Sequence, residues 1–225
     1  MQYSKLLDCL HEYAESDFAL FQRKLIFTKY TILGVRTPIL RKLAKTFQAD
    51  WKEVLTFPNV YYEVVFLKLT MISQLSFEEF VEQLPGAVAL MDNWALCDQC
   101  KAKCISKNRE ALLPTLEMLF QSREEYAQRY VLVTLLAYYM EEEYLPMIWA
   151  YIRQANSEYY YVHMAMAWLI AEVLVKFYEV GITWLQQEAI PSKTHNKAIQ
   201  KAIESYRLTQ TEKERLRSLK IKMKI

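Results

Sequence analysis

Asp98 and Trp94 are the two residues whose types and spacing most clearly suggest chemistry. They lie four residues apart in the segment NWALCDQC (93–100). The segment predicts a helix, which would place both side chains on one side. The other residues of this predicted helix are mostly apolar or cysteine. A carboxylate beside an indole there is a helix cap, an ion-pair partner of Lys101, or a functional group that stabilises positive charge.

Three cysteines in the same segment suggest a metal site at first sight. Cys97, Cys100 and Cys104 follow the spacing C-x2-C-x3-C, which also places three thiols on one face of a helix. A closed zinc site needs four ligands, and the remaining cysteine, Cys9, is distant in sequence. We therefore interpret the three thiols as small buried residues rather than as metal ligands.

The other usual signs of catalysis or cofactor binding are missing. His11, His163 and His195 show no metal-ligand spacing, and His163 lies in a mostly apolar segment, as a core residue would. The sequence has no nucleophile elbow, no H-E-x-x-H, no P-loop and no G-x-G-x-x-G. Common hydrolase, metalloprotease and nucleotide-binding sites are therefore not supported.

The charged residues divide the sequence into two basic ends and an acidic centre. Residues 18–45 hold seven Lys/Arg and no Asp/Glu, and residues 193–225 hold ten Lys/Arg against three Glu. Residues 46–192 hold ten basic and nineteen acidic residues. This pattern fits a polyanion bound at both ends, and it equally fits lysines and arginines that only solvate helix surfaces.

The composition predicts an all-α fold. With 3 Gly and 6 Pro in 225 residues, and no Asn-Gly, Asp-Gly or Gly-Gly pair, the turns of β-hairpins have no support. Residues 162–175 are apolar nearly all round, which suits a helix buried between two others. The basic tail from Leu216 is expected to form a final helix or a frayed end.

Helix-start signals recur along the chain. Capping boxes are predicted at Ser76–Glu79, Ser122–Glu125 and Thr211–Glu214, a cap followed by proline at Thr37-Pro38, and simple caps at Ser157 and Ser192. Five of these caps lie roughly 35 to 46 residues apart, the length of a two-helix HEAT-like unit. We expect one domain spanning residues 1–225, a curved HEAT-like solenoid.

The chain is expected to be cytoplasmic. No apolar stretch approaches the ~20 residues of a membrane span. Asp8 and Glu12 argue against a signal peptide at the N-terminus. Four cysteines in such a chain are expected to be reduced thiols.

Four segments in order resemble the DNA alkylation repair family, the AlkD-like HEAT-repeat DNA glycosylases. LGVRTPILRKLAK (33–45) resembles the family's N-terminal signature, and NWALCDQC resembles its W-x-x-x-D motif. YAQRYVLV (126–133) is similar to the helix with the active-site arginine, and HMAMAWLIAE (163–172) to the helix with a second tryptophan. The resemblance covers nearly the whole chain.

The resemblance implies an enzyme that hydrolyses the N-glycosidic bond of cationic N3- or N7-alkylated purines in duplex DNA. Asp98 would stabilise the cationic sugar and position water, as carboxylates do in glycoside hydrolysis. Trp94 and Trp168 would pack against the sugar and backbone, and Arg129 would hold a phosphate. The resemblance implies that the lesion need not be flipped into a deep pocket. The proposed chemistry needs no metal or organic cofactor, and we expect a monomer with no membrane partner.

The basic ends then acquire a role as phosphate contacts. One set crowds the predicted helix at Thr37, and the other forms a stripe with a spacing of four residues. The residues in these two sets are Arg36, Arg41, Lys42, Lys45, Lys193, Lys197 and Lys201.

Two positions depart from the family's pattern. Leu25 stands where active members carry a tyrosine that faces DNA, and Ala171 stands where they carry an arginine. These departures keep two alternatives open. One is a weakly active or inactive relative that binds damaged or branched DNA. The other is a scaffold for protein interactions, a common use of helical repeats.

Overall fold

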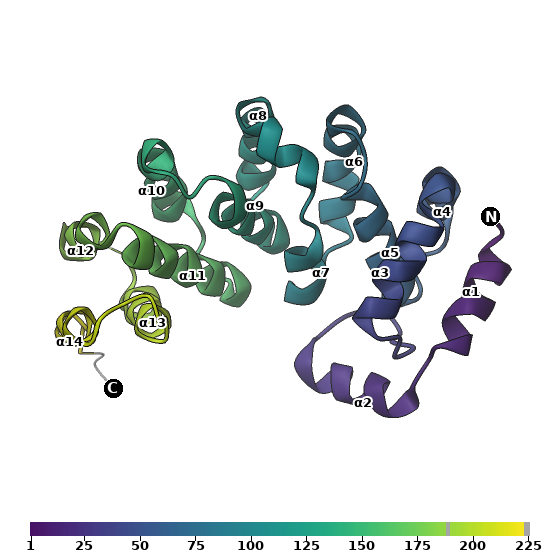
Figure 1. Ribbon diagram of the computed structural model, residues 1–225, viewed down its shortest axis with the longest axis horizontal. Helices are drawn as coiled ribbons and strands as arrows, with labels where there is room; N and C mark the ends of the chain where they lie inside the picture. Colours follow the sequence, from purple (N-terminus) through teal and green to yellow (C-terminus); the bar gives the residue numbers. More distant parts are fainter. Residues whose placement is uncertain (188–189, 223–225) are drawn as a thin grey trace. The chain divides into compact units, whose positions relative to one another are not determined.

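The computed structural model describes residues 1–187 and 190–222 (Figure 1). It divides into two compact units, residues 1–115 and 116–225. The first contains α1 (Tyr3–Glu12), α2 (Ser16–Leu25), α3 (Thr37–Thr46), α4 (Trp51–Thr56), α5 (Tyr62–Ile72), α6 (Phe77–Ala89) and α7 (Trp94–Gln99). The second contains α9 (Glu125–Tyr138), α10 (Leu145–Gln154), α11 (Tyr160–Lys176), α12 (Tyr178–Gln187), α13 (Ser192–Ile203) and α14 (Gln210–Ser218), and α8 (Arg109–Gln121) crosses the boundary.

The all-α prediction is confirmed, with each helix packed on neighbours as in a helical repeat protein. Over the described ranges the only β-type pairing is an isolated bridge between Thr31 and Tyr61, and the short 3-10 helices are η1 (Gln48–Asp50), η2 (Lys103–Lys107) and η3 (Glu142–Tyr144). None of the helices described has the length and apolar character needed to cross a membrane.

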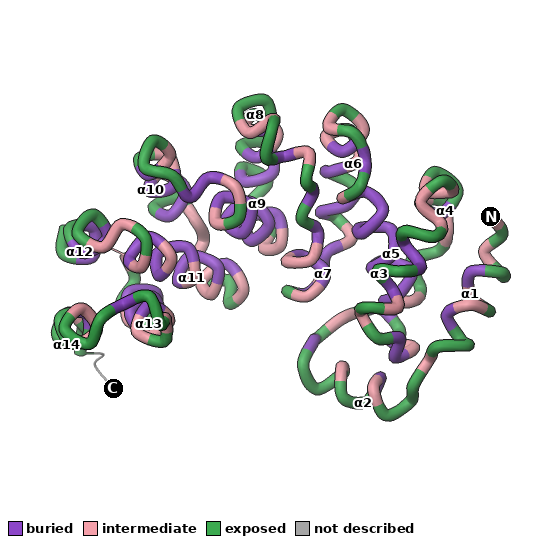
Figure 2. Tube along the Cα trace, viewed as in Figure 1, coloured by how far each residue is buried: buried purple, intermediate pink, exposed green. Residues whose placement is uncertain are grey.

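Helix α5 forms the core of the first unit. All eleven of its residues are buried, and it packs against α3, α4, α6 and α7 (Figure 2). A helix that is apolar on every side must be covered on every side, which explains its central position. Two charged residues, Glu63 and Lys68, are nevertheless buried within it.

The Glu63 carboxylate binds the backbone that precedes α3. It accepts hydrogen bonds from the amides of Leu33, Gly34 and Val35, at N···O distances of 3.1, 2.8 and 3.2 Å. Glu63 is fully buried, so these donors replace the water that the carboxylate lost. The carboxylate therefore fixes the turn that leads into α3.

Gly34 makes this turn possible. Its φ is +92°, a conformation that L side chains rarely adopt. An added Cβ would also collide with the backbone carbonyl oxygen of Glu15 and the backbone nitrogen of Ala19. The Gly34 carbonyl in turn accepts a hydrogen bond from the Glu15 amide at 3.1 Å, so α2 starts against this turn.

Lys68 closes the C-terminal end of α4. Its ammonium donates to the carbonyls of Leu55 and Phe57 and to the side chain of Asn59. Carbonyls at the end of a helix lack partners within the helix, and a lysine is a suitable donor for them. Burial lowers the pKa of Lys68 to about 8.

Helix α11 plays the same central role in the second unit, packing against α9, α12 and α13. The prediction of a helix buried between others at residues 162–175 is confirmed, since most residues in that range are buried. The basic tail begins within helix α14, which comes after α13 in the chain and ends at Ser218. Residues 223–225 of the tail lie outside the described residues.

The capping predictions have mixed outcomes. The capping box at Ser76–Glu79 is confirmed. The box at Ser122 is wrong: α9 begins at Glu125 because Arg123 takes a positive φ of 63° and turns the chain. The box predicted at Thr211–Glu214 lies two residues too late, since Thr209 and Glu212 form the one observed.

The remaining predicted caps are displaced or wrong. Thr37 and Ser192 are the first residues of their helices, and the N-caps are Arg36 and Pro191. Each N-cap therefore lies one residue before the predicted position, which is within the usual uncertainty of helix ends. Ser157 does not cap α11, which begins three residues later at Tyr160.

We predict that Glu63→Gln lowers the free energy of unfolding by about 2–3 kcal/mol. Hydrogen bonds to a charged acceptor contribute about 1.5–3 kcal/mol. Glutamine carries no negative charge, and its NH2 group would face backbone N–H groups that also need an acceptor. Urea denaturation followed by circular dichroism measures the change. Glu82→Gln, at an exposed position on α6, is the matched control and should change stability by less than about 0.5 kcal/mol. Equal stability of the two variants would contradict the assigned role of Glu63.

Candidate functional site

Helix α7 carries both Trp94 and Asp98 and is fixed at its first turn by Asn93. The buried Asn93 side chain accepts hydrogen bonds from the amides of Ala95 and Leu96, at 3.0 and 3.1 Å. A helix of six residues is marginal by itself, so the cap and the packing on α5 must hold it. Asn93 thus sets the direction of the Trp94 and Asp98 side chains.

Asp92 joins this helix to the segment that follows α2. Its carboxylate accepts from the Thr28 hydroxyl at 2.8 Å, from the Lys29 amide at 2.7 Å and from the Asn93 side chain at 2.7 Å. The Tyr30 hydroxyl adds a bond to the Leu90 carbonyl at 2.8 Å, and burial raises the pKa of Tyr30 to about 12. Three of these hydrogen bonds, from Thr28, Lys29 and Tyr30, therefore hold two distant segments together.

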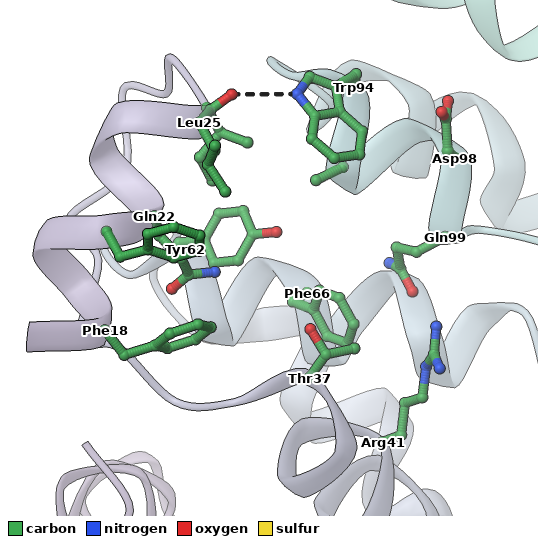
Figure 3. A pocket seen from close by; sticks show the side chains of 13 residues that line it. Phe18, Gln22, Leu25, Thr37, Arg41, Tyr62, Phe66, Trp94, Asp98 and Gln99 are labelled. Atoms are coloured by element: carbon green, nitrogen blue, oxygen red, sulfur yellow. Dashed lines mark hydrogen bonds between the residues drawn. The ribbon is translucent and has the colours of Figure 1, made fainter. Parts of the chain in front are cut away.

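A pocket of about 350 Å³ opens beside α7 and contains both residues of the predicted pair (Figure 3). Trp94 is 39% exposed, and its indole N–H donates to the Leu25 carbonyl at 3.3 Å. Asp98 is half-buried on the pocket wall. The other lining residues come from α2, α3, α5, α7 and Ile26 just after α2, and they are Phe18, Phe21, Gln22, Leu25, Ile26, Thr37, Arg41, Tyr62, Phe66, Ala95 and Gln99.

The pocket combines aromatic walls with few polar groups. Tyr62 is buried in α5, and burial together with the charges of Glu63 and Asp92 raises the pKa of its hydroxyl. That hydroxyl therefore stays protonated at neutral pH and points into the pocket (Figure 3). Arg41 supplies the cation of the pocket, and Asp98 supplies the carboxylate.

Arg129 and Trp168 belong to the second unit. Arg129 is only 5% exposed, donates to the Tyr161 carbonyl at 2.9 Å, and lies 5.8 Å from the centre of the Tyr161 ring. Trp168 is half-buried and lines a separate hollow of about 270 Å³. Ala171, which is buried, Lys201 and Arg207 line the same hollow.

The predicted phosphate contacts of the first unit are exposed. Arg36 already binds the Glu15 carboxylate through two hydrogen bonds of 2.7 Å and lies 4.7 Å from the Phe18 ring centre. This pairing lowers the pKa of Glu15. Lys42 and Lys45 project from α3 together with Arg41.

The basic stripe on α13 is less uniform than predicted. Lys193 is exposed but lies 3.5 Å from the Glu158 carboxylate, whereas Lys197 is exposed and Lys201 is half-buried beside Trp168. Next to this stripe, His163 bonds the Thr194 hydroxyl at 2.9 Å. Burial and the charges of Lys193 and Lys197 lower the pKa of His163. His163 is half-buried rather than a fully buried core residue.

The prediction that the three clustered cysteines share one helix face is wrong. Helix α7 ends at Gln99, and Cys100 leaves helical geometry with ψ of 69°. Cys97 and Cys100 are buried, as expected of small core residues, and burial raises the pKa of Cys100 to about 12. No group of three or more metal-binding side chains occurs in the described parts of the chain.

The comparison with known proteins places the chain in a family. Residues 6–207 match the family model described as DNA alkylation repair enzyme. The chain belongs to the DNA alkylation repair enzyme family. None of the curated proteins compared with the chain matches it. The family match covers every predicted site residue, and it supports a role in DNA repair.

Several residues that shape the site of this DNA alkylation repair enzyme were missed by the sequence analysis. Asn93 and Asp92 precede Trp94 directly, and an asparagine before a helix is a capping signal that could have been used. Tyr62 and Phe18 reach the pocket from other helices, and no local pattern marks them.

We predict that Asn93→Ala lowers the free energy of unfolding by about 1–2 kcal/mol, because two amides of α7 lose their acceptor. Chemical denaturation measures the loss. Asn93→Ser keeps a capping oxygen and should retain part of that stability. If alanine and serine destabilise equally, the cap does not hold α7.

Proposed function

We propose that the chain is a DNA glycosylase that hydrolyses the N-glycosidic bond of cationic N3- or N7-alkylated purines in duplex DNA. The carrying observation is the placement of Asp98 next to Trp94 in an open, aromatic pocket of a DNA alkylation repair family member. The substrate and the reaction are the proposal, and the family is its support.

The proposed chemistry uses the positive charge already on the damaged base. An alkylated purine with that charge is a good leaving group, and the bond to C1′ breaks with positive charge growing on the sugar. The Asp98 carboxylate stabilises that charge and orients the water that attacks C1′. The purine leaves with the bonding electrons as a neutral base, and the water, once its oxygen has bonded to C1′, releases its extra proton to the solvent.

Trp94 and the second unit contribute binding in this proposal. The exposed part of the Trp94 ring packs against the cationic sugar, an attraction of about 0.5–2 kcal/mol. Trp168 packs against the backbone, and Arg129 bonds a phosphate. In the structure the Arg129 guanidinium donates to the Tyr161 carbonyl at 2.9 Å, a bond that holds the side chain in place.

The substrate is double-stranded DNA held by its phosphates, and the lesion need not leave the helix. Arg41, Lys42 and Lys45 present their charge on α3, next to the pocket, and Lys197 presents its charge on α13. The reaction as proposed uses no metal or organic cofactor and one copy of the chain.

A second candidate function is binding of damaged or branched DNA with little or no excision. Leu25 favours it, because this residue is 52% exposed at the pocket rim and its side chain has no polar or aromatic group to offer there. Ala171 favours it as well, since its buried methyl group adds no positive charge of its own to the hollow beside Trp168, where the cations are Lys201 and Arg207.

We predict that Asp98→Asn reduces release of free base from methylated duplex DNA by at least about 10²-fold, the size expected when a preorganised electrostatic contact is lost. DNA binding should persist, because no phosphate contact changes. Asp17→Asn, at an exposed position outside the pocket, is the matched control and should keep full activity. Equal base release by wild type and Asp98→Asn would remove Asp98 from the mechanism.

Both candidate functions require DNA binding, and they differ in whether a base is released. We predict that Lys42→Gln combined with Lys45→Gln reduces the slope of log affinity against log salt by up to about 2, since each phosphate contact contributes close to 1. Fluorescence anisotropy of a labelled duplex measures it. An unchanged slope would exclude both residues as phosphate contacts. Salt-dependent binding without base release from any alkylated duplex would favour the second candidate.

A further inference from the structure

We propose a second DNA subsite next to the pocket, in which Phe27 stacks on a base and the hollow beside it receives a backbone phosphate. The proposal rests on the proposed binding of DNA at the Asp98 pocket and extends it to a neighbouring nucleotide. Its support comes from the segment between α2 and the turn at Gly34. The proposed reaction makes no use of this segment.

Phe27 is unusually exposed for an aromatic side chain. It is 87% exposed, while the residues on either side of its segment, Ile26 and Tyr30, are buried. A phenylalanine in water loses the stabilisation of burial, about 1.5–3 kcal/mol, so its exposure needs another explanation. Exposed aromatic residues that lie among positive charges are typical of sites where unpaired bases stack.

The segment that presents Phe27 is held rigidly. Directly after it, Thr28 and Lys29 are bound to the Asp92 carboxylate. Two residues before it, the Leu25 carbonyl accepts from the Trp94 indole. Phe27 is therefore anchored on one side to Trp94 of α7, the helix that carries Asp98, and on the other to Asp92, two residues before that helix. Little conformational entropy remains to be lost when a ligand binds such a side chain.

The chemistry around Phe27 fits a nucleic-acid strand. Phe27, Arg23 and Lys29 line a hollow of about 360 Å³. Residues 18–45 contain no acidic residue, and within the described part of the chain Arg23 and Lys29 form no ion pair. Two cations beside an aromatic ring match a phosphate and its attached base.

The position of the subsite suggests how it acts. Leu25 lines the Asp98 pocket, and Phe27 lines the adjoining hollow only two residues further along the chain. A strand held by one site is thus within reach of the other. Stacking on Phe27 would fix the nucleotide that neighbours the lesion, and so set the register of the damaged sugar at Asp98.

Binding of DNA by Phe27 variants tests the subsite without requiring catalysis. The probe is a fluorescein-labelled duplex containing a stable abasic-site analogue, with affinity measured by anisotropy at several salt concentrations. We expect Phe27→Ala to weaken binding about tenfold with an unchanged salt slope, and Phe27→Trp to retain affinity. We expect Arg23→Gln with Lys29→Gln to lower the slope itself.

Leu20→Ala is the matched control. Leu20 is a 57% exposed apolar residue on α2 that lines neither hollow, so its loss should leave affinity unchanged. Thermal unfolding of each variant checks that the exposed substitutions leave the fold intact.

The possible failures are distinguishable. Affinity of Phe27→Ala within twofold of wild type, or an equal loss for Phe27→Ala and Leu20→Ala, would overturn the subsite. The proposed glycosylase function would be unaffected, because it is judged by base release and Asp98→Asn. Conversely, a loss of affinity specific to Phe27→Ala would support the subsite even if no base were released.

Discussion

A buried negative charge that must be neutralised by backbone amides organises the first unit. The Glu63 carboxylate is fully buried from solvent, so the chain at Leu33, Gly34 and Val35 has to bring its N–H groups to it. This requirement fixes the turn before α3, and the same turn receives the start of α2. The pocket walls from α2, α3 and α5 therefore depend on a group that is not itself part of the pocket.

The helices were predictable because their apolar pattern is local. The buried character of α11 follows from residues that are apolar nearly all round, and the box at Ser76 has its glutamate in the right place. The ends were harder to predict. Thr209 and Thr211 both stand three residues before a glutamate, so the sequence offers two overlapping boxes and only packing selects one.

The candidate site was predictable only in part, for a similar reason. Trp94 and Asp98 share a helix, and a spacing of four residues is sufficient to place them side by side. The walls contributed by Phe18 and Tyr62 depend on how α2 and α5 pack, which no spacing reveals. The end of α7 was missed because Cys100 changes its backbone conformation without a glycine or proline to announce it.

The burial of Cys100 bears on how the protein responds to methylating agents. Methylating compounds react with thiolates far faster than with thiols. With a pKa of about 12, the Cys100 side chain holds its proton at physiological pH and is shielded from solvent as well. The sulfur two residues from Asp98 is thus a poor target for methylation.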